Sequence, residues 1–127
     1  MIGSNPKLKS NKGGVRSSVI RVLSGIKPIP TAHKIGEKLV LLSQDEFDSP
    51  ITQISVTILH SGEKSELHTH ETMDEHFFIL SGNGEMVLDN EQVKCECGMY
   101  ILVPARTSHS ICAFSDMKCI TIGVSLD

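Results

Sequence analysis

The chain has 127 residues, a length that suits one domain, and its hydrophobic fraction of 39% is typical of a globular protein. No apolar run approaches the roughly 20 residues of a membrane-spanning helix, which excludes that class, and no apolar segment follows the basic residues near the start, so we expect a cytoplasmic protein. The formal net charge is −3, so no nucleic-acid partner is expected, although residues 1–36 carry seven basic side chains and no acid.

The first 36 residues are expected to precede the main domain. Residues 1–14 combine Gly, Ser, Asn, Pro and Lys with few apolar anchors, which predicts a flexible leader. Residues 15–36 form an N-terminal arm, whose first part matches either a helical face or a strand added to a sheet. Pro28 and Pro30 then favour extended or turn-like chain. His33 follows them and is expected to carry no role, with a place over a barrel mouth as the lesser alternative.

From residue 37 to residue 127, short β-runs alternate with turn residues. This pattern predicts an all-β sandwich or barrel with about eight or nine strands. The segment 84–96 reads as a hairpin with Asp89 and Asn90 at its tip, because both residue types tolerate a positive φ. The expected runs are 37–43, 52–60, 65–70, 75–80, 84–96, 99–103, 108–114 and 118–126.

The strongest local signal for chemistry is His68-x-His70. On a strand, residues i and i+2 share a face at roughly 6–7 Å, so two imidazoles can bind one ion. Glu75 follows a loop that is long enough for the next strand to fold back, and its carboxylate can then reach the same ion. His109 comes from a distant segment. Three imidazoles and one carboxylate suit one divalent metal ion, either Fe, Mn, Ni, Co or Zn.

Two motifs in this region resemble those of the cupin superfamily. Residues 62–82 follow the pattern G-x5-H-x-H-x4-E-x6-G, and residues 98–109 follow the pattern G-x5-P-x-R-x2-H. The second motif departs from the family at Arg106, where Gly is frequent, and Ala113 follows where Asn is frequent. The resemblance implies a small cupin-type domain over residues 37–127, folded as a double-stranded β-helix or jelly-roll barrel. It also implies that the metal ligands are His68, His70, Glu75 and His109.

Apolar side chains are expected beside these ligands. If Glu75 faces the interior, alternation along the strand predicts the same for Phe77 and Ile79, and an inward His109 predicts an inward Ile111. The expected cavity lining, with simple core packing as the alternative for each side chain, comprises Phe77, Ile79, Met86, Tyr100, Ile111 and Phe114.

Two further side chains are candidates for a catalytic role. The phenol of Tyr100 could act as a proton donor or base. The guanidinium of Arg106 could bind a substrate carboxylate or phosphate through two hydrogen bonds, and a solvated loop position is its alternative.

Three functions are compatible with such a site. A metal-dependent enzyme that acts on a small molecule in the barrel mouth is the leading hypothesis. A non-catalytic module that binds or senses a small molecule, and a structural metal that stabilises the barrel, are the alternatives. The fold does not select a reaction, so enzymatic activity stays open. We expect a homodimer, because small barrels of this superfamily often pair strands or sheet faces.

Overall fold

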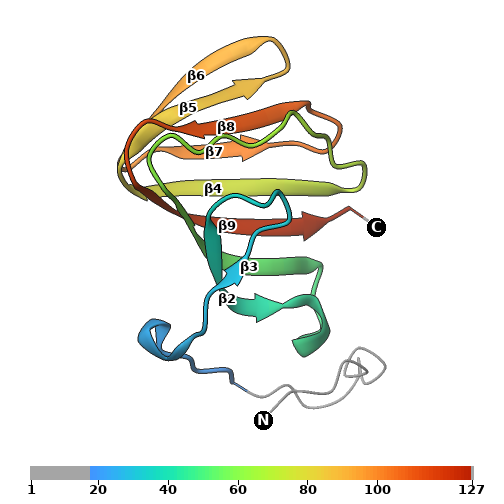
Figure 1. Cartoon of the computed structure of the whole chain (residues 1–127). Helices are drawn as coiled ribbons and strands as arrows, with labels where there is room; N and C mark the ends of the chain where they lie inside the picture. Colours follow the sequence, from blue (N-terminus) through green and yellow to red (C-terminus); the bar gives the residue numbers. More distant parts are fainter. Residues whose placement is uncertain (1–17, 127) are drawn as a thin grey trace.

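The computed structural model describes residues 18–126, and in that range the chain folds mainly into β-strands (Figure 1). Two short 3-10 helices are the only helices among these residues, namely η2 (Leu23–Gly25) and η3 (Gln44–Glu46). Neither has the length or the hydrophobicity to cross a membrane. The strands are β1 (Ile29–Pro30), β2 (Glu37–Ser43), β3 (Ile51–Leu59), β4 (Met73–Ser81), β5 (Asn83–Leu88), β6 (Glu91–Glu96), β7 (Tyr100–Val103), β8 (His109–Ala113) and β9 (Met117–Ser125).

The strands form two sheets. The larger has the order β1-β2-β3-β9-β4-β7, and the smaller has the order β6-β5-β8. Every strand pair in both sheets is antiparallel. The C-terminal strand β9 lies between β3 and β4, so segments far apart in the sequence lie side by side (Figure 1). The architecture therefore depends on long-range pairing, as in other jelly rolls.

The hydrophobic core joins the inner faces of the two sheets. Ile79 of β4, Met86 of β5 and Cys95 of β6 are fully buried and belong to one cluster. Phe78 and Leu80, which flank Ile79 in β4, are exposed, as the two-residue period of a strand requires. Burying one such aliphatic side chain stabilises the fold by about 1.5–3 kcal/mol. Alternation thus sends one face of β4 into the barrel and leaves the other face outside.

The all-β jelly-roll fold expected from the sequence is confirmed, but one of the expected strands does not form. The hairpin of β5 and β6 turns at Asp89, which has φ 55°. The segment 65–70, expected as a strand, forms a single isolated bridge to β8, between His68 and His109. The backbone N–H of Ile111 donates to the hydroxyl of Ser65 at 3.0 Å, so a side chain interrupts the regular ladder there.

The N-terminal arm contributes one short edge strand. Ile29 of β1 pairs with Lys38 of β2, which extends the larger sheet by two residues. Residues 18–22 form neither the helix nor the strand that the sequence left open. The expected leader 1–14 and the first residues of the arm lie outside the described residues. The division into leader, arm and barrel stays a prediction.

Candidate metal centre

Four side chains expected as metal ligands converge at one end of the barrel. His68 and His70 come from the loop between β3 and β4, Glu75 lies in β4, and His109 begins β8. One donor atom from each of the four lies within 4.8 Å of each of the others. The imidazole of His109 is almost fully buried, and the other three side chains are half-buried. The group could therefore hold one metal ion.

A backbone bridge fixes the distant ligand beside the local ones. The N–H of His68 donates to the carbonyl of His109 at 2.9 Å, and the N–H of His109 donates to the carbonyl of His68 at 2.9 Å. The two ring centroids are 4.1 Å apart. His70 is held in turn by Arg106, whose backbone N–H donates to the His70 carbonyl at 2.7 Å. The ligand loop is thus tied to the β7–β8 turn through the backbone.

The outer nitrogens of two imidazoles are oriented by carbonyl groups. The Nδ1 of His109 lies 2.9 Å from the Thr107 carbonyl, and the Nδ1 of His68 lies 2.8 Å from the Glu66 carbonyl. A carbonyl only accepts hydrogen bonds, so each Nδ1 carries the proton and each Nε2 keeps a lone pair in the neutral ring. Metal-binding histidines are commonly oriented through such a contact on the other ring nitrogen.

The carboxylate of Glu75 lies at the centre of the group. Its Oε1 is 3.1 Å from the Nε2 of His109 and 3.2 Å from the Nε2 of His70. Because the Nδ1–H of His109 already donates to Thr107, its Nε2 needs a second proton or a metal ion to lie this close to a carboxylate. This observation fits a donor set built around a cation.

Without an ion, the charges of this group shift two pKa values in opposite directions. Burial would raise the pKa of Glu75, but the hydrogen bond from His109 and the nearby His70, His109 and His68 outweigh it and lower that pKa. Burial would lower the pKa of His109, but its contacts with Glu75 and the Thr107 carbonyl outweigh it and raise that pKa. The pair favours a carboxylate beside an imidazolium. A divalent cation could take the place of the proton that the imidazolium holds on its Nε2 atom.

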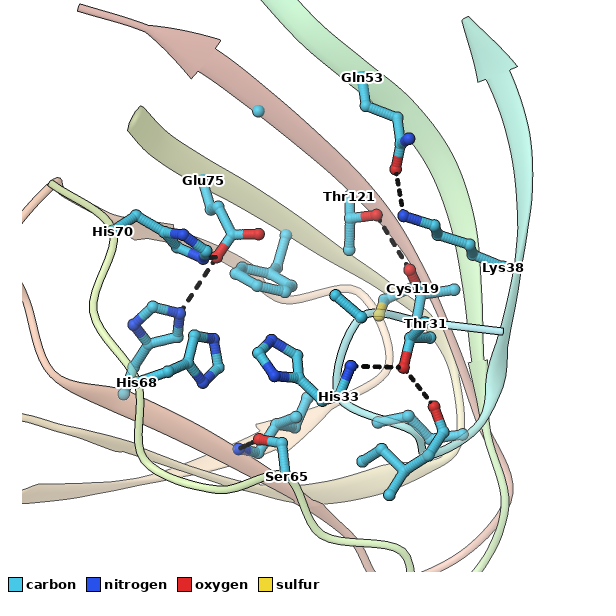
Figure 2. A pocket seen from close by; sticks show the side chains of 18 of the residues that line it. Thr31, His33, Lys38, Gln53, Ser65, His68, His70, Glu75, Cys119 and Thr121 are labelled. Carbon is cyan, nitrogen blue, oxygen red and sulfur yellow. Dashed lines mark hydrogen bonds and ion pairs between the residues drawn. The ribbon is translucent and has the colours of Figure 1, made fainter. Parts of the chain in front are cut away.

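The ligand group borders a cavity of about 350 Å³ (Figure 2). Phe77, Met86 and Ile111 line it, as expected from the sequence. Thr31, His33 and Ile35 reach it from the segment before β2. The cavity lies inside the barrel, with the histidines and Glu75 gathered on one side of it.

Three residues expected in the lining lie elsewhere. Ile79 is fully buried in the core and does not reach the cavity, because it lies one row deeper than Phe77 in β4. Tyr100 is 57% exposed, since it pairs with Phe78 and shares the outer face of the sheet. Phe114 follows the last residue of β8 and is 52% exposed. Alternation therefore places Tyr100 on the outer face, whereas Ile79 faces inward and packs in the core, and Phe114 lies beyond the end of β8.

The two candidates for a catalytic role also lie outside the cavity. The hydroxyl of Tyr100 lies 2.7 Å from the Nδ1 of His76 on the outer face. Arg106 is exposed, and its guanidinium donates to the carbonyl of Glu71 at 3.2 Å. Its φ of 68° explains why glycine suits this position of the motif. Arg106 orients the loop that carries His70 and does not line the cavity.

His33 is a lining residue to which the sequence interpretation gave little weight. Its ring stacks on His68 with the two centroids 3.9 Å apart and the planes tilted by 35°. Burial lowers its pKa, although the nearby Glu75 carboxylate opposes this effect. His33 lines the cavity, and its ring lies against the imidazole of His68 (Figure 2).

Sequence reasoning missed a group of polar side chains on the wall formed by β2, β3 and β9. They are Lys38, Gln53, Thr57 and Thr121, and all of them line the cavity. The available signal was the two-residue period of polar side chains along 53–57. A rule that assigns polar residues to solvent misplaces them, because a cavity makes the inner face of a strand polar.

Comparisons with known proteins agree on one family. The family model described as the cupin domain matches residues 55–123. An uncharacterised protein of Methanocaldococcus jannaschii is 40% identical over 71 residues, which cover 56% of this chain and 57% of that relative. The match thus spans little more than half of the curated relative's length.

Solved structures show the same fold. A predicted oxalate decarboxylase from Thermotoga maritima superimposes with a TM-score of 0.78 at 22% identity, covering 85% of this chain and 100% of the other. Ectoine synthase from P. lautus gives a TM-score of 0.73 at 19% identity, with 85% and 78% covered. A cupin superfamily protein from Desulfitobacterium hafniense gives 0.63 at 21% identity, with 78% and 84% covered. At these identities the likeness extends to the fold alone.

Proposed function

This chain belongs to the cupin domain family, and from that premise we propose that it is a metal-dependent enzyme acting on a small molecule in the barrel cavity. The observation that carries the proposal is the convergence of four donor side chains, within 4.8 Å of one another, on the wall of a cavity of about 350 Å³. The proposed ligands of one divalent ion are His68, His70, Glu75 and His109.

The position of the ligand group favours a reactive over a structural metal. A purely structural ion is normally enclosed by its ligands, whereas all four of these side chains border the cavity. An octahedral ion with four protein ligands keeps two positions for other groups. Once bound, the ion would supply Lewis-acid chemistry to an oxygen of the substrate.

The chain's own residues would bind and shield the substrate. Phe77, Met86 and Ile111 give the cavity an apolar wall that excludes water and accommodates a carbon skeleton. His33 lines the cavity against His68 and can donate a hydrogen bond to a bound molecule. The carbonyls of Thr107 and Glu66 orient two of the imidazoles so that their Nε2 atoms face the centre.

The donor set suits Fe, Mn, Ni, Co or Zn. Elemental analysis of the purified chain tests the site directly. We expect one equivalent of metal in the wild type and loss of that metal in the double variant His68→Ala/His70→Ala. The matched control is His60→Ala/His76→Ala, which removes two histidines that do not line the cavity.

Retention of one equivalent by the His68→Ala/His70→Ala variant would refute the assignment. Thermal unfolding of the same preparations guards against a trivial loss of fold. A cooperative transition that moves to lower temperature without metal supports a preformed site, since a ligand stabilises only the state that binds it. A chain that unfolds without cooperativity when metal is removed would favour the structural alternative.

A non-catalytic binding module is the second candidate, and one observation favours it. Tyr100 and Arg106 lie outside the cavity. Apart from the four ligands, the titratable side chains among the described lining residues are His33, Lys38 and Cys119. Burial raises the pKa of the Cys119 thiol to about 12, so that thiol stays protonated near neutral pH. If the metal-loaded chain binds small molecules tightly but never converts them, the binding module is the correct function.

The expected homodimer stays a prediction, and the outer face of β4 and β7 is where it can be tested. Phe78, Tyr100 and Leu102 are each more than 40% exposed on that face. Light scattering should give about twice the chain mass of 13.9 kDa, and Leu102→Glu should reduce it to one copy. Leu67→Glu changes an exposed leucine in the ligand loop and is the control. A monomeric wild type would exclude the dimer.

A further inference from the structure

The cavity wall opposite the metal ligands carries one cationic side chain. Among the described residues that line the cavity, Lys38 is the only lysine or arginine (Figure 2). It lies in β2, half-buried, and pairs with Thr57 of β3. Neither the sequence motifs nor the proposed metal site gives this lysine a role.

The hydrogen bonds of Lys38 leave its positive charge uncompensated. Its Nζ donates to the Oε1 of Gln53 at 2.9 Å, and the hydroxyl of Ser55 donates to the same oxygen at 2.8 Å. Across residues 18–126, no carboxylate lies within ion-pair distance of Lys38. An ammonium group has three donors and is costly to remove from water without an anionic partner. The lysine therefore favours an anion from outside the chain.

Neutral polar groups share the wall with this charge. The hydroxyls of Thr57 and Thr121 lie 3.0 Å apart, so that one donates to the other, and the hydroxyl of Thr121 also lies 3.5 Å from the carbonyl of Ser55; both threonine side chains line the cavity. The Oε1 of Gln53 accepts from Lys38 and Ser55, and this directs the amide nitrogen away from them. One positive charge with hydroxyl and amide groups matches an anion with a single charge, such as a carboxylate.

The register of the strands sets the distance between this wall and the metal ligands. Gln53 and Glu75 both pair with Gly123 of β9, so they lie in one row across the inner face. Neighbouring strands are about 4.8 Å apart, which puts the two Cα atoms about 10 Å from each other. Gly123 lies between them, and the side chains of Thr52 and Met73 meet over it, with the hydroxyl of Thr52 3.2 Å from the sulfur of Met73. Gln53 and Glu75 both line the cavity of about 350 Å³, and a small molecule in that cavity can reach from one to the other.

We infer that Lys38, with Gln53 and the Thr57–Thr121 hydroxyl pair, binds the carboxylate of a small organic acid whose other end faces the four metal ligands. This inference rests on the proposed function and names its substrate class. The positively charged wall orients the acid, and the metal centre receives the oxygen group at the far end. Lys38 is a specificity-determining residue, because a neutral molecule of the same shape would leave its charge unpaired.

Binding of simple dicarboxylates tests this assignment. The probes are the straight-chain acids from malonate to adipate, each compared with its neutral diamide, at pH 7 on the metal-loaded full chain. Calorimetry gives the affinity, and amide shifts in a two-dimensional NMR spectrum locate the site. We expect at least one acid to bind at least tenfold more tightly than its diamide, with shifts in β2 and β3.

Variants separate the charge of Lys38 from its bulk. Lys38→Met should weaken binding of that acid at least tenfold and leave the weak binding of the diamide unchanged, and Lys38→Arg should restore most of the affinity. Lys94→Met removes an exposed lysine from β6 and should bind as the wild type does. The inference is overturned if no acid binds, if acids and diamides bind equally, or if folded Lys38→Met binds as tightly as the wild type.

Metal content measured on the same samples keeps the two proposals apart. A wild type that contains no metal but still binds the acid through Lys38 would refute the metal-dependent function and retain the carboxylate site. A wild type that contains one metal ion but binds no acid more tightly than its diamide would refute the carboxylate site and retain the metal-dependent function.

Discussion

Gly82 makes the sharpest test of how the barrel is closed. It is the single residue between β4, which carries Glu75, and β5 of the other sheet. Its φ is 81°, and a Cβ at this position would overlap the backbone carbonyl oxygen of Asp116 and lie 2.8 Å from the Cα of Met117. The substitution Gly82→Ala therefore meets both an unfavourable backbone conformation and a backbone obstacle.

Gly98 supplies a matched control, because it has the positive φ of Gly82 but no backbone atom where a Cβ would lie. Its φ is 90°, but nothing lies within 4 Å of a Cβ built there. A positive φ costs an L-residue about 1–2 kcal/mol. Steric overlap that forces the backbone to shift costs roughly a further 1–3 kcal/mol. We therefore expect losses of about 2–5 kcal/mol for Gly82→Ala and about 1–2 kcal/mol for Gly98→Ala.

Urea unfolding followed by far-ultraviolet circular dichroism measures both losses. The chain has no tryptophan, so indole fluorescence cannot serve. A chelator in every sample removes any contribution from bound metal. The entropy that alanine removes from the unfolded chain is common to both variants and cancels in the comparison. Equal losses for the two variants, at unchanged denaturant slopes, would refute the argument that the turn at Asp116 blocks a side chain at position 82.

Three further outcomes are expected from the core and the ligand group. Ile79→Ala should lose about 2–5 kcal/mol in urea unfolding, because the side chain is fully buried; a loss below 1 kcal/mol would contradict this packing. With chelator present, the wild type should exceed Glu75→Gln in unfolding free energy by the largest amount between pH 4.5 and 6.5. This advantage is lost as the pH falls through the lowered pKa of Glu75, and it is lost again as the pH rises through the raised pKa of His109. A difference in unfolding free energy that does not depend on pH would refute the ion pair. Alkylation at pH 8 should modify the exposed Cys97 well before Cys119, whose burial raises its pKa to about 12; peptide mass spectrometry detects the order, and equal rates would contradict it.

Local spacing in the sequence determined much of the candidate site. His68 and His70 are separated by one residue, so in an extended chain they share a face. Glu75 follows after four residues, and a short loop that folds the chain back brings it beside them. The hairpin at Asp89 was predictable for the same reason, because its turn chemistry is local. The family resemblance then identified His109, which local spacing alone could not link to the other three.

The face of the sheet on which a residue lies was harder to predict from the sequence. Tyr100 and Phe77 are both aromatic residues of strands, yet one is outside and the other lines the cavity. The register of β7 against β4 decides this, because Tyr100 pairs with the outward Phe78. A shift by one residue would exchange the two faces, and the composition of a short strand does not specify the register.

The sequence by itself determined an all-β fold, a two-residue hairpin turn and a candidate set of four metal ligands, because each depends on short spacings or on a motif. The tertiary structure alone decided what faces those ligands. His33 covers His68, and Lys38 lies across the cavity with Gln53, although nothing near them in the chain marks either residue. The physical reason is that β9 inserts between β3 and β4, and this long-range pairing brings separate segments to the walls of one cavity.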